Sequence, residues 1–301
     1  MVLSRVIRLR TALVALAIVG TAGALSAGGS GAVASNHSNG RGYLALGDSV
    51  AFGYITHDQP AYVNAANFVG YPEDAGTGLH LDVANASCPG ETSQGFLDLT
   101  KPDNGCRPFR AHFPVHVTYS GTQMDYATNY LKHHDDTKLV TLGIGANDGF
   151  LLVDSCAAKQ PPDPQCVANG LPALAKLIAT NVHTILSKVR ATGYEGVLMI
   201  VNYYSLNYAD PTSTGFSVVL NNALKAGMAG ENAVLADVFT AFANATNTAQ
   251  AGGDTCKAGL LNGSPSTNAA GDVQVSVTGQ KLMARTVERA YSAATGEGGD
   301  T

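Results

Sequence analysis

Tryptophan is absent from this 301-residue sequence, and charged residues make up only 14% of it, against about 25% in typical soluble domains. The lysines and arginines form no basic block, and the formal net charge is -5. This argues against nucleic acid as a partner, because phosphate binding needs clustered positive charge. Stacking on a sugar or a base would have to use the 12 tyrosines and 9 phenylalanines.

Metal-ligand patterns are missing as well. The sequence has no CxxC pair and no cluster of cysteine and histidine at metal-binding spacing. The adjacent His133 and His134 lie in a charged stretch that is typical of a solvated helix end. We therefore expect no metal and no cofactor.

The one long apolar run lies at the N-terminus, over residues 11–20. It follows three arginines and leads into small residues up to about Ala34, which is the pattern of a cleaved secretory signal peptide. The alternative is a membrane anchor, but glycines between 20 and 29 leave the run short of the ~20 residues that span a bilayer. We expect a signal peptide over 1–34, one secreted domain over 35–301 that is a monomer, and no membrane span after cleavage.

Export permits disulfides. The proline-rich stretch from Cys156 to Cys166 favours a bridge across that loop, and Cys88 with Cys106 is the next natural pair. Cys256 then stays unpaired, although spacing alone leaves the connectivity open.

Short apolar runs alternate with helical patterns along the rest of the chain. The strands are expected at 43–46, 82–86, 138–143, 196–201 and 233–237, and the helices at about 124–134, 168–192, 214–229 and 279–293. This alternation predicts a parallel sheet covered by helices on both faces, whose ligands bind beyond the carboxyl ends of the strands. The segments 57–80 and 154–166 are predicted to be surface excursions.

The first strand runs into Gly47-Asp48-Ser49. A glycine at a strand-to-helix turn allows a sharp bend and leaves the serine hydroxyl at a helix N-terminus, where negative charge is favoured. The alternative is an ordinary N-cap serine. Ser49 is thus a candidate nucleophile.

Two further strand ends carry candidate oxyanion donors. Gly90 follows the second strand and could bring its backbone N–H close to a ligand, although alone it is only a turn. Asn147 follows the third strand, just after Gly145, and its amide could donate to an oxyanion. An Asx-turn or helix cap is the competing interpretation of Asn147.

The order Ser49, Gly90, Asn147 on successive strand ends resembles the first three sequence blocks of the SGNH (GDSL-type) hydrolases, and residues 201–205 resemble the fourth-strand segment. The resemblance covers about residues 42–292. It implies an α/β fold, a three-layer α/β/α flavodoxin-like sandwich with a mainly parallel five-stranded sheet. It also implies hydrolysis of a small-molecule or lipid ester through an acyl-enzyme on Ser49. The oxyanion hole would combine the N–H groups of Ser49 and Gly90 with the side chain of Asn147.

The last block departs from the family pattern. The usual catalytic histidine is replaced by Gln274, and Asp272 stands nearby, although the commoner spacing would place the acid at Gly271. An amide cannot accept the serine proton at neutral pH. Loss of the base costs on the order of 10⁶ in kcat in a serine hydrolase.

Three interpretations follow. The chain is a secreted serine esterase or lipase, weakly active or served by a substitute base from His57, His112 or His116. Alternatively, it is a catalytically impaired relative that binds acyl or glycan ligands. It could also be a variant copy of an active enzyme that carries histidine at 274.

Overall fold

The computed structural model describes residues 41–56, 62–262 and 272–296. Five strands form one sheet in the order β2-β1-β3-β4-β5, and every neighbouring pair is parallel. The strands are β1 (Gly42–Gly47), β2 (Asp82–Asn85), β3 (Thr137–Gly143), β4 (Val197–Val201) and β5 (Ala233–Ala236). All five predicted strands are confirmed, with ends shifted by a residue or so.

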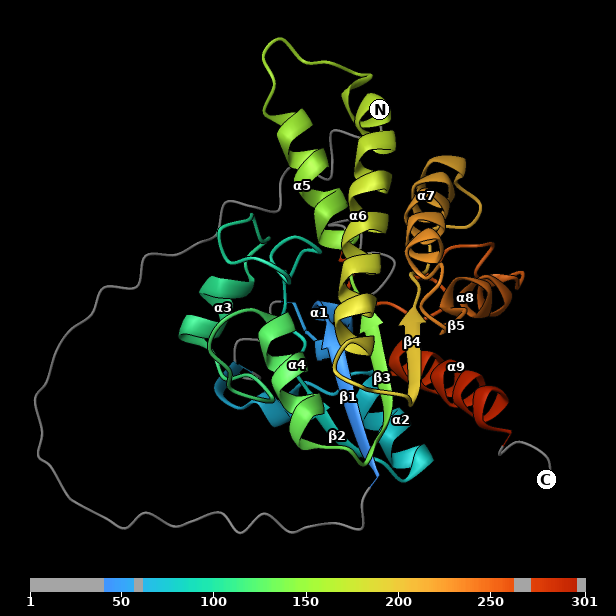
Figure 1. Ribbon diagram of the computed structural model, residues 1–301. Coiled ribbons are helices and arrows are strands. Elements are labelled where there is room, and N and C mark those ends of the chain that lie inside the picture. Colours follow the sequence, from blue (N-terminus) through green and yellow to red (C-terminus); the bar gives the residue numbers. More distant parts are fainter. Residues whose placement is uncertain (1–40, 57–61, 263–271, 297–301) are drawn as a thin grey trace, which may run out of the picture.

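Helices cover both faces of this sheet (Figure 1). One face packs against α4 (Gln123–His133), α6 (Cys166–Arg190) and α7 (Pro211–Gly227), and the other packs against α2 (Tyr71–Leu79), α8 (Val238–Thr246) and α9 (Val277–Thr295). The four helices predicted from apolar periodicity are therefore confirmed. The arrangement is the predicted three-layer α/β/α sandwich, with the strand order of the flavodoxin-like folds. No helix in the described ranges is long and apolar enough to cross a membrane.

The core lies on both faces of the central strands. Every residue of β1 is buried, and so are all but one of β3, which is why both strands are nearly continuous apolar runs. The helix α6 buries one stripe against the sheet, formed by Ile178, Val182, Ile185, Leu186 and Val189. These positions follow the i, i+3/i+4 spacing of an amphipathic helix.

The segment predicted as a surface excursion over 57–80 contains a structural helix, which corrects that prediction. In α2, Tyr71, Pro72 and Ala75 are buried, and the helix packs against β2 and α9. Glycine at 76 permits this contact, because a Cβ there would collide with the side chain of Val83. Proline and glycine are typical of loops. The composition of α2 therefore favours a loop, although the segment forms a packed helix.

The excursion predicted over 154–166 is partly helical. The helix α5 (Ala146–Ala157) runs into it, and α5 and the first turns of α6 extend beyond the sheet as a hairpin (Figure 1). Cys156 and Cys166 form a disulfide across its tip, as predicted. The second predicted bridge, Cys88–Cys106, is also present, and Cys256 is free and buried. The expected signal peptide over 1–34 lies outside the described residues.

Candidate active site

Ser49 begins the short helix α1 (Ser49–Phe52), directly after β1. Gly47 bends the chain with a φ of 143°, and a Cβ at this position would collide with the carbonyl oxygen of Gly143 on the neighbouring strand. Only glycine therefore permits this turn. The Ser49 side chain is half-buried, and its hydroxyl forms no hydrogen bond with another described residue.

The Asp48 side chain fixes the serine turn by hydrogen bonds. Its buried carboxylate accepts hydrogen bonds from the Val50 N–H at 3.0 Å and from the Tyr203 hydroxyl, which comes from the end of β4. Burial raises the pKa of Asp48 to about 6, and the two hydrogen bonds oppose that rise. Asp48 therefore fixes the serine turn to the sheet.

The first three strand ends are joined by backbone hydrogen bonds. The Asp48 N–H donates to the carbonyl of Gly143 at 3.2 Å, and the Cys88 N–H donates to the carbonyl of Gly47 at 3.0 Å. Gln123, at the start of α4, adds a two-point contact: it accepts from the Gly47 N–H at 2.7 Å and donates to the Gly47 carbonyl at 3.0 Å. The structure thus holds the ends of β1, β2 and β3 together.

Asn147 lies in the first turn of α5 and is buried. Its Nδ2 donates to the carbonyl of Glu91 at 2.9 Å, and its Oδ1 accepts from Nδ2 of Asn104 at 2.8 Å. These contacts bring Asn147 to the turn that carries Gly90. One hydrogen of the Asn147 Nδ2 group makes no bond to another described residue, so it can serve a ligand.

Gly90 occupies this turn with a φ of 86°. Its carbonyl accepts from the Asn104 N–H at 2.7 Å, whereas its own N–H donates to no other described residue, and neither does the N–H of Ser49. Each of the three predicted residues, Ser49, Gly90 and Asn147, therefore has one donor that no described residue uses.

Asp272 and Gln274 lie on the loop before α9. Asp272 accepts from the Gln274 N–H at 2.9 Å and from the hydroxyl of Thr56 at 3.2 Å. Thr56 follows α1, so the loop that carries Asp272 and Gln274 contacts the segment that follows the serine turn. Gln280, in the first turn of α9, donates to the Val50 carbonyl at 3.0 Å and strengthens the same approach. The Gln274 Oε1 atom is buried and has no hydrogen-bond partner among the described residues.

The histidines considered as substitute bases form no hydrogen bond with Ser49 where the structure describes them. His112 is exposed, and the ring nitrogen of His116 lies 3.1 Å from the carbonyl of Phe52, at the other end of α1. His57 lies outside the described residues. No group of three or more His, Cys, Asp and Glu side chains suited to a metal gathers in the described ranges.

The sequence pattern missed the polar residues that support the site. The side chains of Gln123, Asn104 and Tyr203 contact site residues that lie 43 positions or more away, and no local motif marks them. Among the supporting residues, Glu91 is the closest in sequence to a predicted site residue, because it directly follows Gly90. Its burial was not expected for a charged residue.

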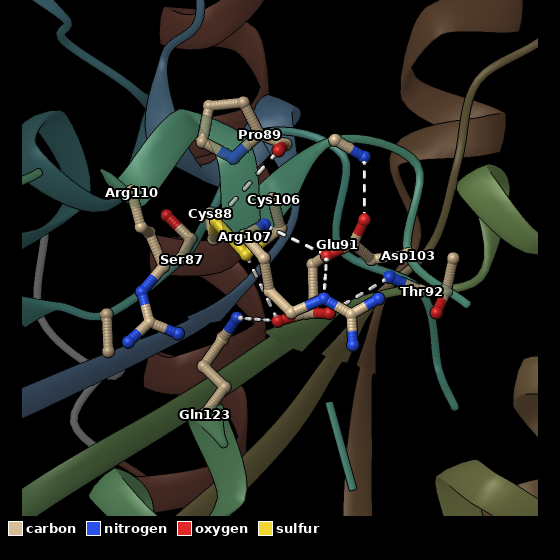
Figure 2. Close-up of a disulfide and its surroundings, with 12 residues drawn as sticks. Ser87, Cys88, Pro89, Glu91, Thr92, Asp103, Cys106, Arg107, Arg110 and Gln123 are labelled. Atoms are coloured by element: carbon tan, nitrogen blue, oxygen red, sulfur yellow. Dashed lines mark hydrogen bonds and ion pairs between the residues drawn. A yellow bond between two sulfur atoms is a disulfide. The ribbon is translucent and has the colours of Figure 1, made fainter. Parts of the chain in front are cut away.

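Glu91 lies beneath the Cys88–Cys106 disulfide, with the Gln123 amide directed at its carboxyl group (Figure 2). Burial, followed by the charge of Asp103, raises the pKa of Glu91 from an ordinary 4.5 to about 8. At a pH between these two pKa values, the Glu91 carboxyl group has lost its proton in the unfolded chain but keeps it in the folded protein. The free energy of unfolding therefore falls as the pH rises through this range.

We therefore expect Glu91→Gln to be more stabilising at pH 9 than at pH 4, by on the order of 5 kcal/mol. The amide keeps the shape of the side chain and carries no charge. Urea unfolding of both proteins at several pH values measures the difference. If the difference does not change with pH, then the carboxyl group titrates normally.

The strand order and the two helical layers define an α/β/α protein of the flavodoxin-like type, with a serine at the turn after the first strand. Residues 45–256 match the sequence model of the GDSL-like lipase/acylhydrolase family, so the chain belongs to this family. Among solved structures, phospholipase A1 from Streptomyces albidoflavus NA297 aligns with a TM-score of 0.53 and 16% identity, over 83% of this chain and 98% of that chain.

A second similar structure is LAE5, an alpha/beta hydrolase enzyme from the metagenome of Lake Arreo. It aligns with a TM-score of 0.50 and 14% identity, over 86% of this chain and 96% of that one. At such identities these likenesses show the fold alone. A search of curated proteins finds no significant match.

Proposed function

We propose that the chain is a secreted serine ester hydrolase of the carboxylesterase or lipase type, acting through an acyl-enzyme on Ser49 at a low rate. The observation that carries the proposal is the set of three free donors: the N–H groups of Ser49 and Gly90 and one Nδ2 hydrogen of Asn147. In the reaction, the Ser49 oxygen attacks the ester carbonyl carbon. The carbonyl oxygen then takes on negative charge, which these donors stabilise. Without a base at the site, the serine proton passes to solvent water, and collapse of the intermediate releases the alcohol, which takes up a proton from water. A second water then attacks the acyl-serine, which releases the carboxylic acid and restores the Ser49 hydroxyl.

The low rate follows from residue 274. A histidine there would take the serine proton, whereas the Gln274 amide cannot do so at neutral pH. The remaining groups can still accelerate the reaction by about 10³ over water. Asp272 is the acid of this block by resemblance, and it would orient a base at 274.

Secretion is supported by the two disulfides and by the N-terminal sequence pattern. Disulfides persist in oxidising compartments. We propose a small-molecule or lipid ester as substrate, no nucleic acid partner, and a monomeric protein.

A second candidate function is binding without turnover, in which the site holds an acyl or glycan ligand. The observation that favours it is the Ser49 hydroxyl, which has no base within hydrogen-bond distance among the described residues. A serine without a base is a weak nucleophile.

A fluorophosphonate probe separates the two candidates, because it phosphonylates only an activated serine. We expect slow labelling of the unmodified protein at Ser49, identified by mass spectrometry of the modified peptide, and no labelling of Ser49→Ala. If neither the unmodified protein nor Gln274→His is labelled, the assignment of the nucleophile is wrong.

A further inference from the structure

Asn104 lies on the loop between β2 and α3 (Cys106–His112), outside every sequence block that marks the site. Its side chain nevertheless contacts the site directly, because Nδ2 of Asn104 donates to Oδ1 of Asn147 at 2.8 Å. This contact joins residues 43 positions apart.

The Glu91 carbonyl and the Asn104 amide together decide which way the Asn147 amide faces. With the amide as it stands, Oδ1 meets a donor on Asn104 and Nδ2 meets the carbonyl of Glu91. A flipped amide would place oxygen against the Glu91 carbonyl and nitrogen against the Asn104 nitrogen, so both contacts would be repulsive. The network therefore keeps the free Nδ2 hydrogen of Asn147 available to a ligand.

Asn104 also braces the second oxyanion donor. Its N–H donates to the Gly90 carbonyl at 2.7 Å, and its own carbonyl oxygen lies close enough to collide with a Cβ placed on Gly90. The segment that carries Asn104 is held at its end by the Cys88–Cys106 disulfide (Figure 2). Next to Asn104, the Asp103 carboxylate accepts from the Arg107 N–H at 2.9 Å and pairs with the Arg107 guanidinium at 2.8 Å. One residue thus contacts both Gly90 and Asn147.

We propose that Asn104 is a positioning residue of the oxyanion hole: it orients the Asn147 amide and holds the Gly90 turn so that both N–H groups face one ester oxygen. This inference rests on the proposed function. Asn104 acts through its neighbours and does not touch the substrate.

The test uses Asn104→Asp in the Gln274→His background, where turnover is fast enough to measure. A carboxylate cannot donate to the Asn147 Oδ1 atom and attracts Nδ2 instead, which turns the amide away from the substrate. We expect kcat for a short-chain nitrophenyl ester to fall by roughly 10- to 100-fold with little change in KM. The control Asn129→Asp makes the same charge change at an exposed position of α4, and we expect it to leave kcat unchanged.

A double-mutant cycle distinguishes positioning from general damage to the fold. If Asn104 acts through Asn147, then adding Asn104→Asp to Asn147→Ala costs far less than it does alone, because the group it orients is gone. Additive losses, or full kcat in Asn104→Asp, would overturn the proposal.

A measurement without turnover separates this proposal from the proposed function. The side-chain amide resonances of Asn147, assigned by their loss in Asn147→Ala, should shift in Asn104→Asp and stay in place in Asn129→Asp. If Gln274→His proves inactive while the resonances shift, the proposed function fails but the orienting contact stands. Unshifted resonances would overturn the role of Asn104.

Discussion

Replacing Gln274 by histidine is expected to raise the rate of ester hydrolysis by at least about three orders of magnitude. The site already holds a serine turn and three free donors, and the missing component is a group that accepts the serine proton. Histidine supplies it, because its neutral ring is a base near pH 7. The Asp272 carboxylate, which already accepts from the backbone of residue 274, is well placed to orient the new ring.

The loop is suited to this substitution, because its contacts use the backbone around residue 274. The Tyr204 hydroxyl donates to the Val273 carbonyl, the Asn262 N–H donates to the Gln274 carbonyl at 2.9 Å, and the Ser276 N–H donates to the Leu260 carbonyl at 2.9 Å. None of these bonds involves the side chain at 274. We therefore expect the loop to accept histidine without rearrangement.

The measurement is kcat/KM for a short-chain nitrophenyl ester across pH 5 to 9. In Gln274→His the rate should rise with pH through an inflection at about 6.5, the ordinary pKa of histidine, and it should vanish when Ser49→Ala is added. Gln274→Asn is the matched control, since it changes the side chain without adding a base. If the unmodified protein already turns over fast and Ser49→Ala abolishes that activity, then another residue acts as base.

The strands and the long helices could be predicted because their signals are local. The β1 and β3 segments are apolar runs buried on both faces, and α6 repeats its apolar stripe over many turns. The helix α2 could not be predicted, since Pro72 and Gly76 favour a loop in isolation. Only the close approach to Val83 explains why glycine is needed there.

The residues of the candidate site also fall into those with a local sequence signal and those without one. Ser49, Gly90 and Asn147 could be proposed from the sequence because each follows a strand and has a glycine or proline within two residues. The residues that orient them, such as Gln123 and Asn104, give no such signal. Their role depends on which distant backbone groups they meet, and the sequence around them does not encode that.

Gly90→Ala, made in the Gln274→His background, is expected to lower kcat by about 10²- to 10³-fold. Alanine is strained at the φ of 86°, and its methyl group would collide with the Asn104 carbonyl and lie 3.0 Å from the Cys106 nitrogen. Because the disulfide holds Cys106 to Cys88, the turn itself must move. The Gly90 N–H is then displaced from the ester oxygen, and the Asn104 contact to Asn147 is disturbed with it.

The matched control is Gly193→Ala, on the connection between α6 and β4. Gly193 has a φ of 90°, and a Cβ there would meet no atom within 4 Å. Both variants therefore carry backbone strain of about 1 kcal/mol or more, but only Gly90→Ala adds a collision beside Ser49. Thermal unfolding should show a larger loss of stability for Gly90→Ala, and the ester assay should show a loss of rate for Gly90→Ala alone. Equal losses of rate in the two variants would mean that strain anywhere in the fold slows the reaction, and that Gly90 has no special part in holding the oxyanion.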